Sequence, residues 1–153
     1  IGEVVLGDFC SVWYQAVVRG DVNKLTIGNR VNIQDGVVIH ATYQKAATTI
    51  GNDVSIGHNA IVHGCTIHDR VLVGMGSIVM DNAVIHSNSI IAAGSVVTQN
   101  TIVEEKSIYA GIPARKIKSL PDELLHGEIE RIAKNYIHYA SWFKAEDNPP
   151  LDE

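Results

Sequence analysis

Branched aliphatic residues recur along this chain with a period of six. The repeat is seen at Ile27, Ile33 and Ile39, then at Ile50, Ile56 and Val62, and an earlier stretch has Leu6, Val12 and Val18. After one step of five residues it continues at Ile67, Val73, Val79, Ile85, Ile91 and Val97. These positions are called anchors below. A small or β-branched residue stands four positions after almost every anchor.

A period of six excludes an amphipathic helix over this region, because such a helix repeats its apolar residues at three and four. It is typical of a short strand followed by a tight corner, with one aliphatic side chain pointing inward on each flat face. Three faces close a triangular coil, and coils stack as parallel strands about 4.8 Å apart. We therefore predict a mainly β protein, a parallel β-helix. A β-sandwich of short strands is the alternative, but its turns rarely keep a fixed period.

The pattern changes after Pro113 and Pro121. Apolar residues then step by three and four, at Leu125, Ile129, Ile132, Tyr136, Ala140 and Phe143, which predicts one face of a helix. Ser119, Pro121 and Asp122 form a reasonable helix start. We expect a β-helix over residues 1–118, a C-terminal α-helix packed on it over 119–145, and a frayed acidic tail over 146–153.

Composition narrows the class of protein. Residues are 46% apolar and 19% charged, and acidic residues outnumber basic ones 17 to 12. This balance argues against nucleic acid or an anionic membrane as partner, since both need clustered Lys and Arg. No apolar run approaches the roughly 18 residues of a membrane span. Cys10 and Cys65 are interpreted as reduced thiols in a cytoplasmic protein. Ile1 falls in mid-pattern without a Met, so we expect a clipped N-terminus.

The phase of the repeat predicts which histidines meet. If residues 20–26 and 41–49 contain loop insertions, Val18, Ile39, Val62 and Val79 share one face. The residues that follow them then form a column, Arg19, His40, His63 and Met80. His40 and His63 would lie on adjacent coils, where two imidazoles can share one metal ion. The alternative is a pair of exposed strand histidines without a ligand.

His58 falls on another face, where Asp35 occupies the equivalent place one coil below and Gln34 is a neighbour. Within one chain it should point away from the His40/His63 pair. Three identical coil stacks around a threefold axis would bring one subunit's face against the next. A three-histidine site at that boundary is then a natural geometry.

The remaining candidates carry weaker signals. His68 and His86 also stack by this count, but no third donor is evident, and we interpret the pair as solvated. His126 and His138 fall on the terminal helix and indicate no site. Cys65 follows His63 closely, but a small buried turn residue is its expected role.

Several short motifs together resemble the gamma-class carbonic anhydrase family, and the resemblance covers nearly the whole chain. They are Val18-Arg19-Gly20-Asp21, Asn32-Ile33-Gln34-Asp35, Ile39-His40, Ile56-Gly57-His58, Val62-His63-Gly64-Cys65 and Tyr109-Ala110-Gly111-Ile112-Pro113-Ala114-Arg115. Hexapeptide repeats alone are shared with many acyltransferases. The order of the three histidines with Arg-Gly-Asp and Asn-Ile-Gln-Asp is the specific signal.

The resemblance implies a left-handed β-helix, a homotrimer and a divalent metal at each subunit interface, usually zinc, with Fe²⁺ or Co²⁺ as alternatives. His40 and His63 of one subunit and His58 of the next match its ligands. The implied reaction is hydration of carbon dioxide to bicarbonate, with a metal that lowers the pKa of its bound water toward 7.

Further roles follow from the same resemblance. Gln34 matches the position that orients bound water or bicarbonate. Arg19 and Asp21 match a pair that spans the subunit boundary, and a purely structural ion pair is the alternative for them. Asp35 matches a neighbouring interface position, and Tyr109 is a weaker candidate for the pocket wall.

The chain departs from well-characterised active members in its proton path. Those carry glutamates that shuttle protons, but here Val22 takes the first place and residues 41–49 contain no carboxylate. We therefore expect slow turnover. Two other functions stay open, an acyl or CoA-thioester transferase or thioesterase on the hexapeptide fold, and a non-catalytic, metal-stabilised scaffold subunit.

Overall fold

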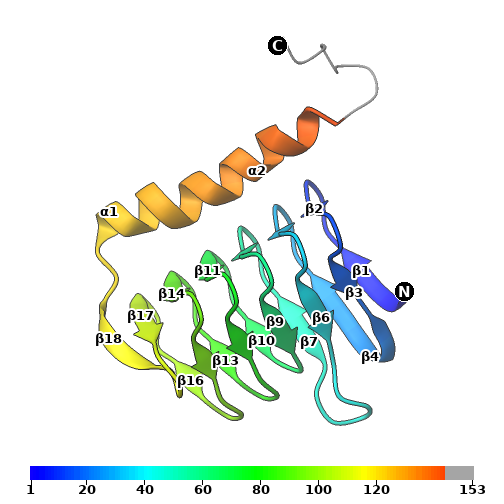
Figure 1. Ribbon diagram of the computed structural model, residues 1–153, viewed down its shortest axis with the longest axis horizontal. Helices are drawn as coiled ribbons and strands as arrows, with labels where there is room; N and C mark the ends of the chain where they lie inside the picture. The colour runs from blue at the N-terminus through cyan, green and yellow to red at the C-terminus, as the bar shows by residue number, and fades with distance from the viewer. Residues whose placement is uncertain (144–153) are drawn as a thin grey trace.

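The chain folds as a stack of triangular coils, seen in a computed structural model that describes residues 1–143 (Figure 1). Three sheets form the faces. The first contains β1 (Gly2–Leu6), β4 (Gly20–Ile27), β7 (Thr48–Ile50), β10 (Thr66–Ile67), β13 (Val84–Ile85) and β16 (Ile102–Val103). The second contains β2 (Ser11–Val12), β5 (Asn32–Ile33), β8 (Ser55–Ile56), β11 (Val71–Val73), β14 (Ser89–Ile91), β17 (Ser107–Ala110) and β18 (Arg115–Ser119). The third contains β3 (Val17–Val18), β6 (Val38–His40), β9 (Ile61–His63), β12 (Ile78–Val79) and β15 (Val96–Val97).

Strands pair in parallel throughout the coils, and the anchors stay in register. Ile33 of β5 pairs with Ile56 of β8. Ile56 pairs in turn with Val73 of β11, and Val73 pairs with Ile91 of β14. These four side chains are fully buried, so aliphatic groups stack along the axis of the coil. This core explains the low aromatic content of the chain and confirms the predicted parallel β-helix.

Two segments differ in detail from the expected loop insertions. Residues 20–26 were expected to contain a loop insertion, and they belong to β4, an eight-residue strand that pairs with β1 through an irregular register. Gly2 and Val4 of β1 pair with Gly20 and Leu25 of β4, so the extra residues of β4 form an irregularity within the strand. The second insertion is a loop over 41–47, closed by backbone hydrogen bonds between Thr42 and Ala46.

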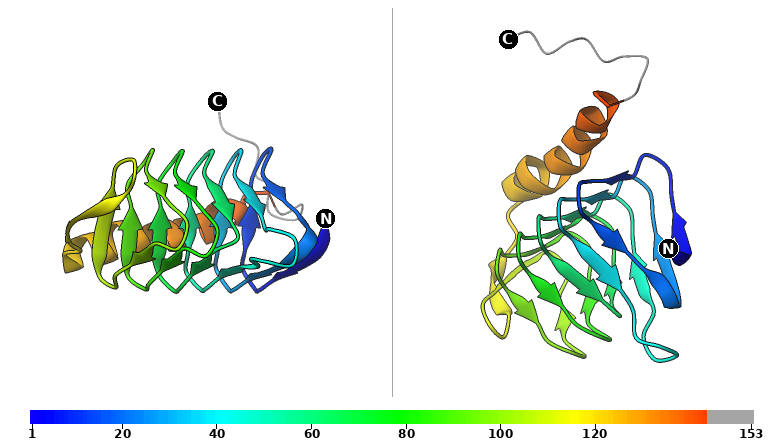
Figure 2. Two further views of the ribbon diagram at one scale, coloured as in Figure 1. Left: turned by 90° about the horizontal axis from the view of Figure 1, so that it is seen from below. Right: turned by 45° about the vertical axis from the view of Figure 1, so that its right-hand side comes forward.

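The coil stack ends in a hairpin. β18 runs antiparallel to β17 and is the edge strand of the second sheet, with all five of its residues exposed. The helical segment follows directly and lies along one side of the coils (Figure 2). It comprises α1 (Asp122–Leu124), the π-helical segment η1 (Leu125–Glu130) and α2 (Arg131–Ser141).

The predicted helix cap is wrong. Ser119 lies in β18, and the N-cap position is Pro121, which makes no side-chain capping bond. Ser119 is unavailable as a cap because the antiparallel pairing with β17 continues to that residue. The acidic tail predicted for 146–153 lies outside the described residues.

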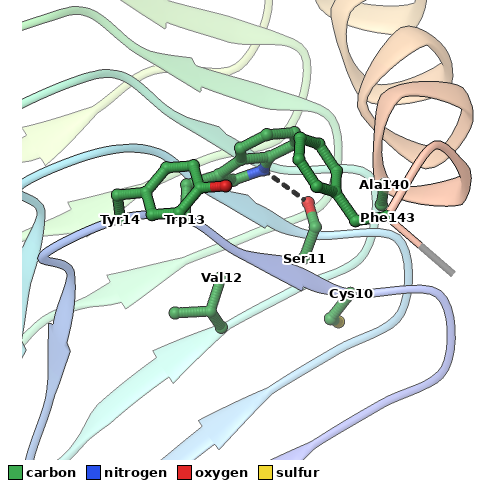
Figure 3. Close-up of a pocket in the computed structure, with 7 residues that line it drawn as sticks. All are labelled: Cys10, Ser11, Val12, Trp13, Tyr14, Ala140 and Phe143. Atoms are coloured by element: carbon green, nitrogen blue, oxygen red, sulfur yellow. Dashed lines mark hydrogen bonds between the residues drawn. The ribbon is translucent and has the colours of Figure 1, made fainter. Parts of the chain in front are cut away.

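The predicted apolar face of the helix does contact the coils. Ile129 is fully buried and packs with Ile108 and Leu120 near the start of the helix. At the other end, Trp13 of the first coil meets the Tyr136 and Phe143 rings edge-on, with centroids 5.3 and 5.8 Å apart. Figure 3 shows Trp13 beside Phe143. The Trp13 indole also donates a hydrogen bond to Ser11. Within residues 1–143, no helix is both long and apolar enough to cross a membrane.

Truncation of an anchor should destabilise the fold far more than truncation of an outward residue. Ile85 of β13 is fully buried, whereas Ile102 of the adjacent β16 is 57% exposed. We expect Ile85→Ala to lower the free energy of unfolding by about 2–5 kcal/mol, from lost burial and the cavity left behind. Ile102→Ala should cost less than about 0.5 kcal/mol. Denaturant unfolding measures both, and equal losses would contradict an inward-facing anchor.

Candidate metal centre

His40 and His63 meet at one corner of the coil stack. They end β6 and β9, and the two residues are register partners in the third sheet. His40 Nδ1 lies 3.1 Å from His63 Nε2, and the ring centroids are 5.1 Å apart at 64°. The backbone is held as well, because Thr48 donates to the His40 carbonyl and accepts from the Gly64 amide. The column predicted from the repeat is confirmed for this pair.

Each histidine has a carboxylate on its far side. His40 Nε2 lies 3.0 Å from Asp21, and His63 Nδ1 lies 2.6 Å from Asp81. The Arg19 guanidinium, 2.7 Å away, lowers the pKa of Asp21, and His40 adds to the effect. Burial of Asp81 opposes ionisation, but hydrogen bonds from Thr42 and His63 outweigh it and lower the pKa of Asp81. Both carboxylates are therefore ionised at neutral pH.

An ionised carboxylate only accepts hydrogen bonds, so the outer nitrogens, His40 Nε2 and His63 Nδ1, carry hydrogen. The inner nitrogens face each other with room for one hydrogen between them. A metal ion bound to both would take the place of that hydrogen. Two nitrogens on one tetrahedral ion at about 2.0–2.1 Å lie about 3.3 Å apart. The observed 3.1 Å matches this separation, so the pair fits two positions of a metal site.

The described residues of one chain do not complete such a site. Among residues 1–143, no three His, Cys, Asp or Glu side chains come together as a metal cage. His58 lies at a different corner, after β8, and its Nδ1 is 3.0 Å from Asp35. That contact confirms the predicted alignment of Asp35 below His58. About 40% of each of these two side chains is exposed.

Gln34 is buried beside this second corner. Its Nε2 donates to Asn32, which in turn donates to Ser55 on the next coil. Gln34 and His58 line one end of a cavity of about 440 Å³ between the second sheet and α2. Asn32 and Ser55 fix the amide orientation, so the Gln34 carbonyl oxygen is left to accept a hydrogen bond.

Comparisons with known proteins place these features in a family. The chain is 49% identical to a probable carbonic anhydrase from Methanocaldococcus jannaschii, over 91% of this chain and 84% of that protein. The chain belongs to the gamma-class carbonic anhydrase family.

Two further matches show how the family varies. Gamma carbonic anhydrase 2, a mitochondrial protein of Arabidopsis thaliana, is 37% identical over the whole chain, which spans 56% of the plant protein's length. A hexapeptide transferase family protein from Anaplasma phagocytophilum has a solved structure with a TM-score of 0.89 and 40% identity, covering 94% of this chain and 83% of that one. The family model for bacterial transferase hexapeptide, six repeats, matches residues 64–99.

The other predicted site residues are placed as follows. Arg19 and Asp21 form their ion pair within the one chain, although the resemblance implied a pair that spans the subunit boundary. Both are partly exposed at the corner that bears His40. Tyr109 occupies an inward position on β17, is 93% buried and belongs to the core cluster. The chain therefore brings Arg19, Asp21, His40 and His63 together, but not Tyr109.

Asp81 and Thr42 belong to the site although the sequence analysis did not select them. Asp81 stands two positions after the anchor Val79, next to Met80, the last member of the predicted column. A search of the second position after each anchor would have found it, as it found Asp35 and His58. Thr42 lies in the 41–47 loop, whose conformation the repeat does not specify.

Two further predictions concern placement alone, and both are confirmed. His68 and His86 stack as the repeat predicted, with centroids 5.1 Å apart and nearly parallel rings. Cys65 is buried in the core, and burial raises the pKa of its thiol to about 12.

Cys65 should therefore be inert in the folded protein. At neutral pH we expect a thiol reagent to label Cys10, which is only half-buried, and to leave Cys65 unmodified, because the thiolate is the reactive form. Mass spectrometry of labelled peptides measures both positions. In denaturant both thiols should react, which serves as the control. Labelling of native Cys65 as fast as Cys10 would contradict its burial.

Proposed function

We propose that this chain is a gamma-carbonic-anhydrase-type metalloenzyme that hydrates carbon dioxide to bicarbonate. The observation that carries the proposal is the His40/His63 pair, whose inner nitrogens face each other 3.1 Å apart. Its relatives from Methanocaldococcus and Arabidopsis carry carbonic anhydrase names, which supports the reaction.

The third ligand in this proposal is His58 of a neighbouring subunit in a homotrimer. Support comes from the incomplete site of one chain and from the placement of His58 at an exposed corner. Asp35 lies 3.0 Å from His58 Nδ1, and His58 Nε2 is the nitrogen that we propose as the ligand. Zinc is the expected metal, with Fe²⁺ or Co²⁺ as alternatives for a three-imidazole site.

When bound by these three imidazoles, a zinc ion would supply a hydroxide near neutral pH for attack on carbon dioxide. The chain's own residues hold and orient the reactants. The Gln34 carbonyl, fixed by Asn32, accepts a hydrogen bond from the attacking group or from bicarbonate. Arg19 and Asp21 anchor the corner beside His40, and Asp35 orients His58. Tyr109 is proposed only as part of the wall behind the site.

Turnover should be limited by removal of a proton. Residues 41–49 contain no carboxylate, and Val22 replaces an acidic residue beside Asp21. Each cycle of hydration releases a proton that must reach solvent. Without an acidic side chain on the loop, external buffer becomes the acceptor.

A second candidate is acyl transfer, favoured by the Anaplasma structure, which is described as a hexapeptide transferase family protein. The cavity of about 440 Å³ between the second sheet and α2 is the place where we would expect such a ligand to bind. Purified protein that binds coenzyme A and holds no stoichiometric metal would favour this function. Metal-loaded protein without any hydratase activity would instead favour a scaffold subunit.

Zinc binding and hydration should depend on the facing histidines. We expect His40→Ala and His63→Ala each to lose bound zinc, because two remaining ligands leave the ion largely in water. Metal analysis and stopped-flow carbon dioxide hydration measure the loss. His68→Ala, a matched change in the other histidine pair, should keep both. Added imidazole should accelerate the unmodified enzyme by accepting protons. A full equivalent of zinc in either alanine variant would refute the ligand assignment.

Two defective chains should complement each other if His58 is donated across a boundary. Consider a mixed trimer of His40→Ala and His58→Ala chains. One kind of interface takes His40 and His63 from a His58→Ala chain and takes His58 from a His40→Ala chain. About a quarter of interfaces in a random equal mixture have this composition. Co-expression followed by metal analysis should show partial recovery of zinc and hydration. Mixed trimers without any recovery would place the three histidines in one chain or in no common site.

A further inference from the structure

Asp81 links His63 to the start of the loop that follows His40. One carboxylate oxygen lies 2.6 Å from His63 Nδ1, and the other accepts a hydrogen bond of 2.5 Å from the Thr42 hydroxyl. Thr42 is itself fixed, because its backbone pairs with Ala46 and its carbonyl accepts from Asn23. Both oxygens of Asp81 are thus engaged, and the carboxylate cannot rotate without breaking one bond.

The backbone around Asp81 is shaped to leave room for this carboxylate. Gly64 has a φ of +56°, and a Cβ there would overlap the Asp81 carboxylate. The Asn82 amide donates to the Gly64 carbonyl over 2.7 Å and holds the two coils together at this point. A glycine is therefore required beside Asp81 both by its left-handed conformation and by the space that the carboxylate fills.

Asp81 is more buried than Asp21, the carboxylate that contacts His40, and it has different hydrogen-bond donors. The Asp21 side chain is 38% exposed and shares its charge with Arg19, whereas that of Asp81 is 17% exposed and receives neutral donors or histidine. A partly buried carboxylate with a fixed orientation imposes a direction on its partner more strongly than an exposed one.

A ring nitrogen that donates to a carboxylate determines which nitrogen is left to bind a metal. We infer that Asp81, braced by Thr42 and accommodated by Gly64, is the positioning residue that holds His63 with hydrogen on Nδ1 and Nε2 free to bind. This inference rests on the proposed metal site, although the contact between Asp81 and His63 is itself seen in the structure. It gives the 41–47 loop a role in ligand geometry.

The experiment compares Asp81→Ala, Asp81→Asn and Thr42→Val with the unmodified protein, and uses Asp8→Asn as the control. Asp8 is an exposed corner residue, so its change removes one carboxylate away from the histidines. Long-range ¹H–¹⁵N spectra of metal-free protein, recorded well above the ordinary histidine pKa of about 6.5, report the His63 tautomer. Competition with a chromogenic chelator reports zinc affinity.

We expect hydrogen on His63 Nδ1 in the unmodified protein and in Asp8→Asn. Asp81→Ala should populate the Nε2–H tautomer and weaken zinc binding by about 10–100-fold. Asp81→Asn should lose less, because an amide oxygen still accepts from Nδ1. Thr42→Val should also lose less, and it should add no loss in the Asp81→Ala background if Thr42 acts through Asp81.

The outcomes separate this inference from the proposed function. An unmodified protein that binds no zinc would refute the proposed metal site, while the tautomer spectra would still support or overturn the role of Asp81. An unchanged tautomer in Asp81→Ala would overturn the inference, even if zinc affinity fell. If Asp81→Ala does not fold, the Asp81→Asn and Thr42→Val variants test the role of Asp81 instead. If the His63 tautomer and the zinc affinity are unchanged in both variants, the inference is overturned.

Discussion

The parallel register between coils is the constraint on which the rest of the molecule depends. Once Ile39 pairs with Val62, the residues that follow must lie side by side, and His40 faces His63. The same two coils align Ile33 with Ile56, so Asp35 reaches His58. Buried aliphatic anchors keep this register, because a slip by one residue would move the whole apolar set out of the core. Core packing and site geometry are therefore consequences of one alignment.

The His40 and His63 imidazoles lie close together, and their outer nitrogens need hydrogen-bond partners. In this chain, Asp21 and Asp81 lie on the outer sides of the pair, and the hydrogen-bonded row continues to Arg19 and Thr42. Without these carboxylates, the facing nitrogens would have little reason to remain oriented toward one another in a corner where both rings are only partly exposed to water. The arrangement is preorganised, and it supplies two donors of a site that needs at least one more.

The sequence predicted the features that follow from regular repetition. The parallel coils, the His40/His63 column and the Asp35–His58 contact all depend only on counting residues from anchors. Features set by irregular segments were beyond this reasoning. The strand at 20–26, the failed Ser119 cap and the antiparallel β18 result from local hydrogen bonding that a repeat does not encode. Thr42 reaches Asp81 only because of the particular turn that its loop makes.

The 41–47 loop shows that residues inserted into a β-helix coil can serve a site at the corner where they lie. Ile39 and Val62 are 23 positions apart, whereas Ile67 and Ile85 in a regular coil are 18 apart. The added residues need not join the core, so their side chains are free to serve the corner from which the loop emerges. A carboxylate on such a loop would face outward to accept protons, whereas Thr42 turns inward to brace a carboxylate. Proton transfer and ligand positioning are thus separable tasks of one insertion, and a chain can perform the second without the first.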